Sequence, residues 1–208
     1  MGRHSDAKQK LMDAVLELIW TGSYGMTTID HICARAGVKK GSFYYFFDSK
    51  CDLAAAALEV DWCQRRAQLD AIFSPTVPPL ERLRNFCDSA YGKQAEMKKK
   101  CGCVLGCPLY SLGSEVCTQE RTLQLKVQEI LSQHRKYVES AIRDAVADHA
   151  IEGSINPAEK AGMVQAYFEG MLTQARIQNN VGVLKDLPRG IAAILGLPAD
   201  TLEAVQAN

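Results

Sequence analysis

The 208-residue chain lacks a long hydrophobic run, since no apolar stretch approaches the ~18 residues that a membrane-spanning helix needs. Its polar first residues also lack the apolar core of a signal peptide, so we expect a cytoplasmic protein with no membrane partner. A net charge is missing too, because 24 Lys and Arg balance 24 Asp and Glu. This balance excludes a uniformly basic coat for nucleic acid but allows a local basic patch.

The chain has no run of alternating apolar and polar residues long enough for a convincing β-strand. Apolar residues instead recur at helical spacing, interrupted by Gly and Pro. This pattern predicts an all-α protein, with helices at residues 7–21, 28–36, 39–45, 49–63, 80–97, 108–117, 119–149, 158–179 and 189–195. Thr27 and Asp30 have the spacing of a capping box, which predicts the start of the second helix.

Two short helices, expected at 28–36 and 39–45, are separated by Gly37 and Val38. Glycine can take the left-handed conformation that a tight turn between helices needs. The second helix is basic at its start and contains Gly41, at a cost of ~1 kcal/mol relative to alanine. A glycine there allows a DNA backbone to approach closely. The pattern is typical of a helix-turn-helix, whose second helix enters the major groove.

The helix-turn-helix interpretation assigns DNA contacts to individual side chains. The candidate base readers are Lys39, Lys40, Ser42 and Tyr45. The candidate phosphate contacts are Thr28, Tyr44 and Lys50, and Gly41 is the position at which a phosphate could approach the backbone. Residues 1–50 hold seven Lys or Arg against five Asp or Glu, a mild basic excess that agrees with this assignment. Two packed helices with a solvated basic turn remain the alternative.

The segment from Thr27 to Lys50, TTIDHICARAGVKKGSFYYFFDSK, closely resembles the N-terminal signature of TetR-family repressors. One departure is Phe46, where the family usually has His, which removes one polar contact near the DNA backbone. The resemblance implies an all-α fold with a three-helix DNA-binding domain, here residues 1–50. A larger effector-binding and dimerisation domain, residues 51–208, would follow it. The resemblance also implies a homodimer that binds palindromic operator DNA.

Eight cysteines in a chain without a signal peptide are best read as reduced thiols. Three of them, Cys101, Cys103 and Cys107, lie just before Pro108. Proline is favoured at the first position of a helix, so Cys107 is expected at its N-cap, where the helix dipole favours a reactive thiolate. Cys107 could instead be a buried structural thiol.

The cysteine cluster could also hold a soft metal, but its spacing is not a common zinc pattern, and we expect neither a metal nor a cofactor. In a helix over 108–117, Cys107 and Cys117 lie ~15 Å apart along the axis. A disulfide needs Cα atoms within ~7 Å. Cys101 or Cys103 would therefore be the better resolving thiol.

The segment from Gly106 to Cys117 resembles the effector domain of the NemR-like branch of TetR repressors. Members of that branch sense electrophiles or oxidants through a cysteine at the Gly-Cys step. The segment from Gly170 to Ile177 resembles a second stretch of that branch, where a basic residue lies near the sensor thiol. The resemblance implies Cys107 as the sensor and Arg176 as its electrostatic partner, with Cys103 and Cys117 as further candidate thiols.

These observations predict a DNA-binding repressor that a small molecule or thiol modification at Cys107 releases from its operator. Modification would move the helix that begins at Pro108, and the shift would pass to the helix at 49–63. One alternative is a repressor with a non-covalent hydrophobic or aromatic effector. A remote alternative is a small cysteine-dependent enzyme, but no histidine shares a motif with a cysteine, so we expect no enzyme.

Residues 158–179 and 189–195 carry more apolar surface than one core stripe needs. By resemblance, these helices pair with a second copy of the chain in a four-helix dimer interface. A monomer that buries them internally is the alternative. A twofold dimer would read two half-sites whose spacing matches its two recognition helices.

Overall fold

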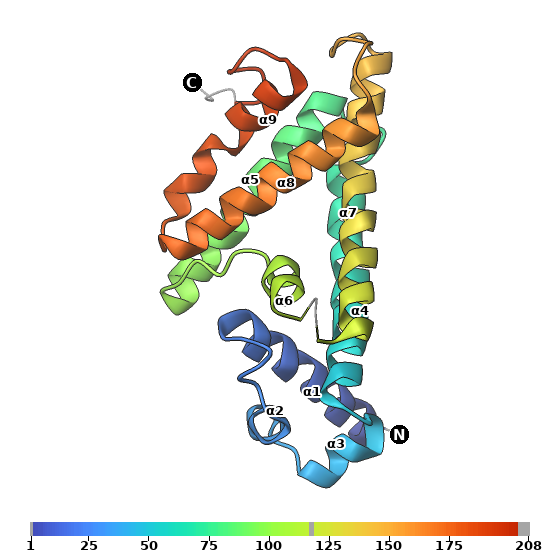
Figure 1. Cartoon of the computed structure of the whole chain (residues 1–208), viewed down its shortest axis with the longest axis vertical. Helices are drawn as coiled ribbons and strands as arrows, with labels where there is room; N and C mark the ends of the chain where they lie inside the picture. Colours follow the sequence, from blue (N-terminus) through green and yellow to red (C-terminus); the bar gives the residue numbers. More distant parts are fainter. Residues whose placement is uncertain (1, 117–118, 204–208) are drawn as a thin grey trace. The chain divides into compact units, whose positions relative to one another are not determined.

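The computed structural model describes residues 2–116 and 119–203, with side chains from residue 6 onward (Figure 1). All regular structure in these residues is helical: α1 (Gly2–Thr21), α2 (Ile29–Ala36), α3 (Lys40–Phe46), α4 (Lys50–Ile72), α5 (Pro79–Cys101), α6 (Pro108–Val116), α7 (Arg121–Ala147), α8 (Pro157–Ile177), the 3-10 helix η1 (Val181–Asp186) and α9 (Leu187–Leu195). The predicted all-α class is confirmed. Cys117, a candidate thiol, lies outside the described residues.

Local signals determine where the helices begin and end. Thr28, not Thr27, is the N-cap of α2, because its Oγ1 accepts a hydrogen bond from the His31 N–H at 3.1 Å. The prediction of a cap at Thr27 was wrong by one residue: this threonine is buried and its hydroxyl donates to the Ser23 carbonyl. Gly37 ends α2 in the left-handed conformation, with φ +65°.

The chain forms two compact units, and each contains segments that are far apart in the sequence. The first unit holds residues 1–66 and 108–131, and the second holds residues 67–107 and 132–208. The chain therefore passes from the second unit to the first at the peptide bond between Cys107 and Pro108. The predicted functional boundary at residue 50 remains a prediction.

In the first unit, α1 packs against α2, α3 and α6. Its core consists of side chains without solvent exposure, including Leu11, Val15, Ile32, Phe43, Leu53 and Leu123. Burying a large aliphatic or aromatic side chain contributes about 1.5–3 kcal/mol. The short α3 therefore depends on the Phe43 side chain for its position, because seven residues make a marginal helix alone.

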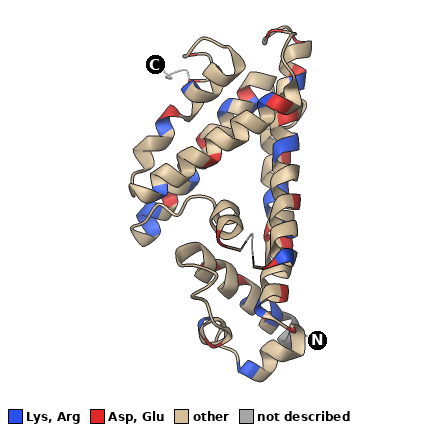
Figure 2. Cartoon of the chain, in the orientation of Figure 1, with Lys and Arg blue, Asp and Glu red and all other residues tan. Residues whose placement is uncertain are grey.

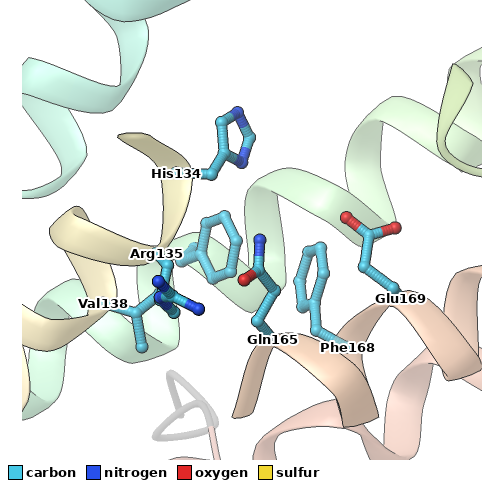
Figure 3. A pocket seen from close by; sticks show the side chains of 7 residues that line it. His134, Arg135, Val138, Gln165, Phe168 and Glu169 are labelled. Carbon is cyan, nitrogen blue, oxygen red and sulfur yellow. The ribbon is translucent and has the colours of Figure 1, made fainter. Parts of the chain in front are cut away.

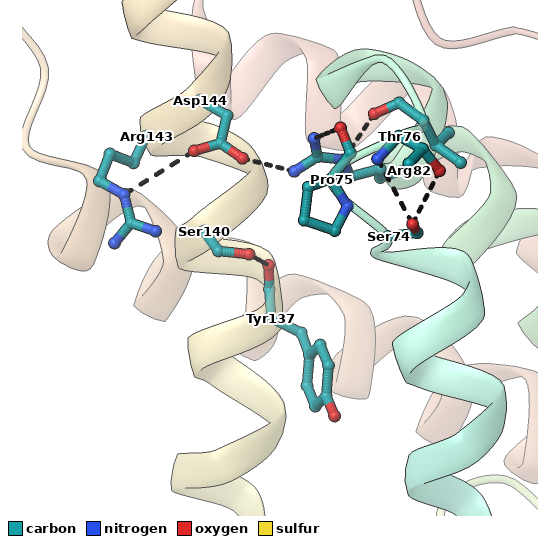
Figure 4. A network of polar contacts seen from close by, with 9 residues as sticks. Ser74, Pro75, Thr76, Arg82, Tyr137, Ser140, Arg143 and Asp144 are labelled. Atoms are coloured by element: carbon teal, nitrogen blue, oxygen red, sulfur yellow. Dashed lines mark hydrogen bonds and ion pairs between the residues drawn. The ribbon is translucent and has the colours of Figure 1, made fainter.

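In the second unit, α8 and α5 both contact η1 and α9. The Phe86 and Phe168 rings stack with centroids 4.3 Å apart. Buried Arg82 holds the turn before α5, because it donates to the carbonyls of Pro75 and Val77 and pairs with Asp144 at 2.5 Å (Figure 4). A buried guanidinium needs such partners to offset its lost hydration.

Across residues 2–116 and 119–203, none of the helices combines the length and the apolar character that crossing a membrane requires.

Candidate DNA-reading helix and cysteine site

α3 has one buried face and one exposed face. Phe43 is fully buried and Phe47, which follows the helix, is 7% exposed. Tyr44 and Tyr45 point the other way, with 55% and 71% of their surface exposed. Adjacent exposed aromatic side chains on a short helix suit contact with a macromolecule. The segment predicted to read DNA is thus accessible.

The basic side chains of α3 lie at its start. Lys39 is the N-cap residue and makes no side-chain capping bond. Lys40 Nζ pairs with Asp30 Oδ1 at 2.9 Å, and their side chains are 52% and 71% exposed. An exposed pair of this kind contributes little to stability. Lys40 can therefore exchange Asp30 for another acceptor at little cost. In Figure 2, basic residues mark the end of α2 and the beginning of α3.

Gly41 lies in the first turn of α3, and nothing in the fold requires a glycine there. Its φ is not positive, and a Cβ at this position would meet no atom within 4 Å. Gly37 differs, because its left-handed backbone favours glycine. The helix penalty at Gly41 is therefore not explained by packing within the chain. This position has room for close approach by an external partner.

Thr28 and Lys50 were predicted to bind phosphate, and both have an internal role in the structure. Thr28 caps α2. Lys50 Nζ donates to the carbonyls of Tyr24 at 2.8 Å and Thr27 at 2.9 Å, and it lies 3.9 Å from the centre of the Tyr24 ring. Burial lowers the pKa of Lys50. A lysine has three N–H donors, so a phosphate contact by Lys50 stays a prediction.

The turn between α1 and α2 is held by a carboxylate from α6. Glu115 accepts the backbone N–H of Tyr24 at 2.9 Å and that of Gly25 at 2.6 Å. A Cβ at Gly25 would lie 2.9 Å from Glu115 Oε1, so a larger residue there would displace this carboxylate group. Hydrogen bonds to a carboxylate are among the stronger ones in proteins. α6 is therefore attached directly to the backbone that leads into the helix-turn-helix.

The backbone that leads to Cys107 is held by one buried glutamine. Gln94 Oε1 accepts the N–H groups of Leu105 at 3.1 Å and Gly106 at 2.9 Å, and Gln94 Nε2 donates to the Gly106 carbonyl at 3.1 Å. Gly106 has φ +65°, and a Cβ there would lie 3.2 Å from the Leu172 carbonyl of α8. The Gly-Cys step thus needs its glycine both for conformation and for packing.

The predicted partners of Cys107 are placed as follows. Arg176 Nη1 donates to the Leu105 carbonyl at 3.2 Å, two residues before Cys107. Cys103 is exposed, and so is Cys101, whose thiol donates to the Met97 carbonyl. Electrostatic pairing of Arg176 with Cys107 and a role for Cys103 both stay predictions. Among the described residues, no three His, Cys, Asp or Glu side chains are arranged to hold a metal.

Cys107 hydrogen-bonds with the buried carboxyl group of Glu169 on α8. The Glu169 residue is 3% exposed, and its Oε2 has no hydrogen-bond partner among the described residues. Burial raises the pKa of Glu169 to about 7, and the bond with Cys107 opposes this rise by a smaller amount. Isolated buried carboxylates are costly, so such groups tend to keep their proton.

Glu169 also lines a narrow pocket between α5, α7 and α8 (Figure 3). Its other lining residues are Phe86, His134, Arg135, Val138, Gln165 and Phe168. The free space measures about 10 Å³, which is roughly enough for one water molecule. A larger molecule could enter only if the lining side chains moved apart.

α3 is exposed and has basic residues at its start. Together with the all-helical fold, this helix defines the class of this protein as a helix-turn-helix DNA-binding regulator. Residues 11–57 match the family described as "Bacterial regulatory proteins, tetR family". Residues 79–190, more than half of the chain, match the family described as "Tetracyclin repressor-like, C-terminal domain". The chain belongs to the TetR family and is a transcriptional repressor rather than an enzyme.

Individual relatives agree with this assignment. AcuR, a transcriptional regulator of Cereibacter sphaeroides, is 27% identical over 173 residues, which are 83% of this chain and 77% of that protein. The transcriptional repressor NemR of Escherichia coli is 22% identical over 205 residues, 96% of this chain and 100% of that protein. The similarity to the NemR-like branch therefore holds at low identity. A regulatory protein TetR from Rhodobacter sphaeroides has a crystal structure with a TM-score of 0.81 and 26% identity, covering 90% of this chain and 98% of that one.

Three residues that sequence reasoning left without a role turn out to organise the site: Gln94, Glu115 and Glu169. The position of Glu169 could have been recognised from the sequence, because Glu169 shares one face of α8 with apolar residues. These residues are the buried Ala161, Val164, Phe168, Leu172 and Ala175. A carboxyl group on such a stripe indicates a buried polar site. The burial of Gln94 was harder to predict from the sequence, since glutamine is common on exposed helix faces. Nothing in the sequence indicated a role for Glu115, because its partners are backbone groups 90 and 91 residues away.

Proposed function

We propose that two copies of this chain bind a palindromic operator together, and that they leave it when Cys107 is modified. Each protomer inserts one α3 into the major groove of a half-site. Lys39, Lys40, Ser42 and Tyr45 contact base edges, while Thr28, Gly41, Tyr44 and Lys50 contact phosphates. Exposure of Tyr44 and Tyr45 supports this assignment. Exposed Met163 and Ile177 on α8, at 48% and 72%, support a dimer through that helix.

One observation carries the regulatory part of the proposal: α6 connects the sensor thiol to the turn before the helix-turn-helix. α6 begins at the residue after Cys107 and carries Glu115 in its last turn. Glu115 in turn binds the backbone of Tyr24 and Gly25. A helix is stiff over nine residues, so a displacement at Pro108 reaches Glu115 largely undiminished. A change at Cys107 can therefore alter the geometry of the DNA-binding helices.

The expected path through the helix at 49–63 joins the same turn. Lys50, the first residue of α4, donates to the carbonyls of Tyr24 and Thr27. Glu115 accepts hydrogen bonds from the N–H groups of this turn, and Lys50 donates hydrogen bonds to its carbonyls. The turn is thus the joint at which α4 and α6 both act on α2 and α3.

Operator release tests the sensor assignment. An operator is first selected from a random DNA library, and binding is measured by fluorescence anisotropy before and after treatment with N-ethylmaleimide. Modification of the wild-type protein should weaken binding about 5- to 150-fold, the usual range of allosteric coupling. Cys107→Ser should bind normally and ignore the reagent, whereas the control Cys63→Ser, which removes an exposed thiol of α4, should respond like the wild type. Normal release of Cys107→Ser would remove Cys107 from the mechanism.

The role of α6 can be tested separately with Glu115→Gln. Glutamine keeps the size of the side chain but exchanges one charged oxygen for an NH₂ group, which cannot accept a backbone N–H bond. We expect Cys107 to react at the normal rate while release from the operator weakens. Glu129→Gln, on the exposed side of α7, is the control. Full release of the Glu115→Gln variant would contradict the proposed path.

A non-covalent effector is the second candidate, because the pocket beside Glu169 has aromatic walls. The stacked Phe86 and Phe168 rings would have to separate around an aromatic molecule. Thermal-shift screening of uncharged aromatic fragments against Cys107→Ser tests this candidate. Fragments that stabilise this variant and release it from the operator would favour non-covalent regulation, and their absence would favour thiol chemistry.

A further inference from the structure

The Cys107–Glu169 pair combines a thiol with a buried carboxyl group that is incompletely satisfied. Glu169 is 3% exposed, its Oε2 has no hydrogen-bond partner among the described residues, and its carboxyl group hydrogen-bonds with the Cys107 thiol. The same side chain lines the narrow pocket of Figure 3. A purely structural buried carboxyl group would have partners for both oxygens. One oxygen of Glu169 is instead available to a molecule that enters the pocket.

We propose that Glu169 accepts the thiol proton of Cys107 when the thiol attacks an electrophile, and then returns this proton to the adduct. This inference rests on the proposed function of Cys107 as a sensor. It assigns Glu169 a chemical role in addition to the packing of α8. The pair thus resembles a nucleophile and its general base, with the carboxylate in the place that histidine often takes.

The proton balance can be written for N-ethylmaleimide. The S–H proton passes to the Glu169 carboxylate while a bond forms between Sγ and one alkene carbon. The electron pair of the C=C bond moves to the carbonyl oxygen and gives an enolate. The Glu169 carboxylic acid then protonates the other alkene carbon. The net reaction adds S–H across the double bond without an oxidant and leaves Glu169 as a carboxylate.

The hydrogen bond with the thiol distinguishes Glu169 from the other polar groups around the site. His134 and Arg135 of α7 line the pocket, Arg176 of α8 binds the Leu105 carbonyl, and α5 contributes the uncharged Gln94 and Phe86. An arginine cannot accept a proton at physiological pH. Glu169 hydrogen-bonds directly with the thiol, and burial raises its pKa to about 7, so it exchanges a proton near neutral pH.

The test is the rate at which N-ethylmaleimide modifies Cys107, measured by peptide mass spectrometry between pH 5.5 and 9. In the wild type, the rate should rise with pH and level off near pH 7. In Glu169→Gln, it should follow an ordinary thiol with a pKa of about 8.5. At pH 7 the variant should react about tenfold to a hundredfold more slowly. The exposed Cys103 thiol is the internal control, and its rate should be equal in both proteins.

Glu169→Asp keeps the carboxyl group but places it one methylene further from Cys107. Cys107 of this variant should therefore be modified at pH 7 at a rate between those of the wild type and Glu169→Gln. Equal or faster modification of Cys107 in Glu169→Gln would overturn the proposal. If that variant did not fold, as judged by circular dichroism, the wild-type profile would decide: a plateau near pH 7 supports the proposal, and a rise through pH 8.5 overturns it.

Operator binding separates this inference from the function on which it rests. A modification rate that depends on Glu169, in a protein that stays on its operator after modification, would support the proton transfer and contradict sensing. A rate that is independent of Glu169, in a protein that still leaves its operator, would contradict the proton transfer and support sensing.

Discussion

The candidate DNA-reading helix α3 and the cysteine site differ in how far their polar side chains are exposed. α3 exposes Tyr44 and Tyr45, and Lys40 is held only by an exposed ion pair. At the cysteine site, Gln94 and Glu169 are 3% exposed, and Gln94 is hydrogen-bonded through both ends of its amide. The first surface is ready for an external partner, while the second is part of the core of its unit.

This difference in exposure predicts that substitutions in α3 change DNA affinity, whereas substitutions at the cysteine site change the stability of the fold. A group that is exposed before binding contributes little to folding, so its replacement should change affinity and leave stability unaltered. A buried polar group contributes to folding through its partners, so its replacement should change stability first. The four predictions below test this separation, from the largest expected effect to the smallest.

Gln94→Leu should be the most destabilising change. It removes the three hydrogen bonds that Gln94 makes with the N–H groups of Leu105 and Gly106 and with the Gly106 carbonyl. Loss of a buried hydrogen bond costs about 1–3 kcal/mol, so we expect a loss of about 4 kcal/mol in the free energy of unfolding after some relaxation. Urea denaturation measures it. Gln128→Leu, the same exchange at an exposed position of α7, is the control and should stay within about 0.5 kcal/mol.

Glu169→Gln should change stability in a pH-dependent way. Because burial raises the pKa of Glu169 from 4.5 to about 7, the native state holds this proton more tightly than the unfolded state. Below pH 4.5 the carboxyl group is protonated in both states and carries no penalty. Between pH 4.5 and 7 the wild type loses stability as pH rises, and above pH 7 the loss is complete at about 3 kcal/mol.

The variant lacks this titration, so it should be more stable than the wild type at pH 8 and similar to it at pH 4.5. Thermal unfolding at both pH values checks the prediction. Glu152→Gln replaces an exposed carboxylate of the same unit and should leave the pH dependence of the wild type in place. A constant difference between wild type and Glu169→Gln at all pH values would indicate a packing effect rather than a buried charge.

The two regions also differ in how far the sequence predicted them. The helix-turn-helix depends on neighbouring residues: Gly37 ends α2, and Phe43 anchors α3. Such local signals allowed the all-α class and the two short helices α2 and α3 to be predicted, while the DNA contacts of α3 stay a prediction. The error at Thr27 arose because two adjacent threonines offer the same capping hydroxyl, and only tertiary packing, which buries Thr27, selects between them.

The cysteine site could be predicted only in part, because it brings together α5, α8 and the segment before α6. The spacing of residues gives no indication that Gln94 binds Gly106 or that Glu169 meets Cys107. The extension of α4 to Ile72 was missed for another reason. The last turns of α4 are largely polar, so apolar residues do not recur there at helical spacing. The residues of these turns nevertheless have a high helix propensity.

Tyr45→Ala should affect binding and leave folding unchanged. Tyr45 is 71% exposed, so its removal takes little from the core. Loss of a base contact costs about 1–3 kcal/mol, so specific operator affinity should fall about tenfold to a hundredfold, while binding to random-sequence DNA stays nearly constant. Anisotropy titrations with both DNAs measure the ratio. Tyr45→Phe separates the hydroxyl from the ring, and an equal loss on both DNAs would remove Tyr45 from the base readers.

Gly41→Ala gives the smallest and most discriminating effect, because it should move folding and binding in opposite directions. A Cβ at position 41 meets no atom of the chain and the backbone is not left-handed, so alanine should stabilise the free protein by about 0.5–1 kcal/mol. The same methyl group would occupy space that we assign to a DNA phosphate, so operator affinity should fall severalfold. Gly37→Ala is the contrasting control, since its φ of +65° makes alanine destabilising. A Gly41→Ala protein that is more stable and binds its operator at full strength would show that the DNA backbone does not approach α3 at this point, and the register of α3 in the groove would then have to be assigned from Tyr45 and Lys40 instead.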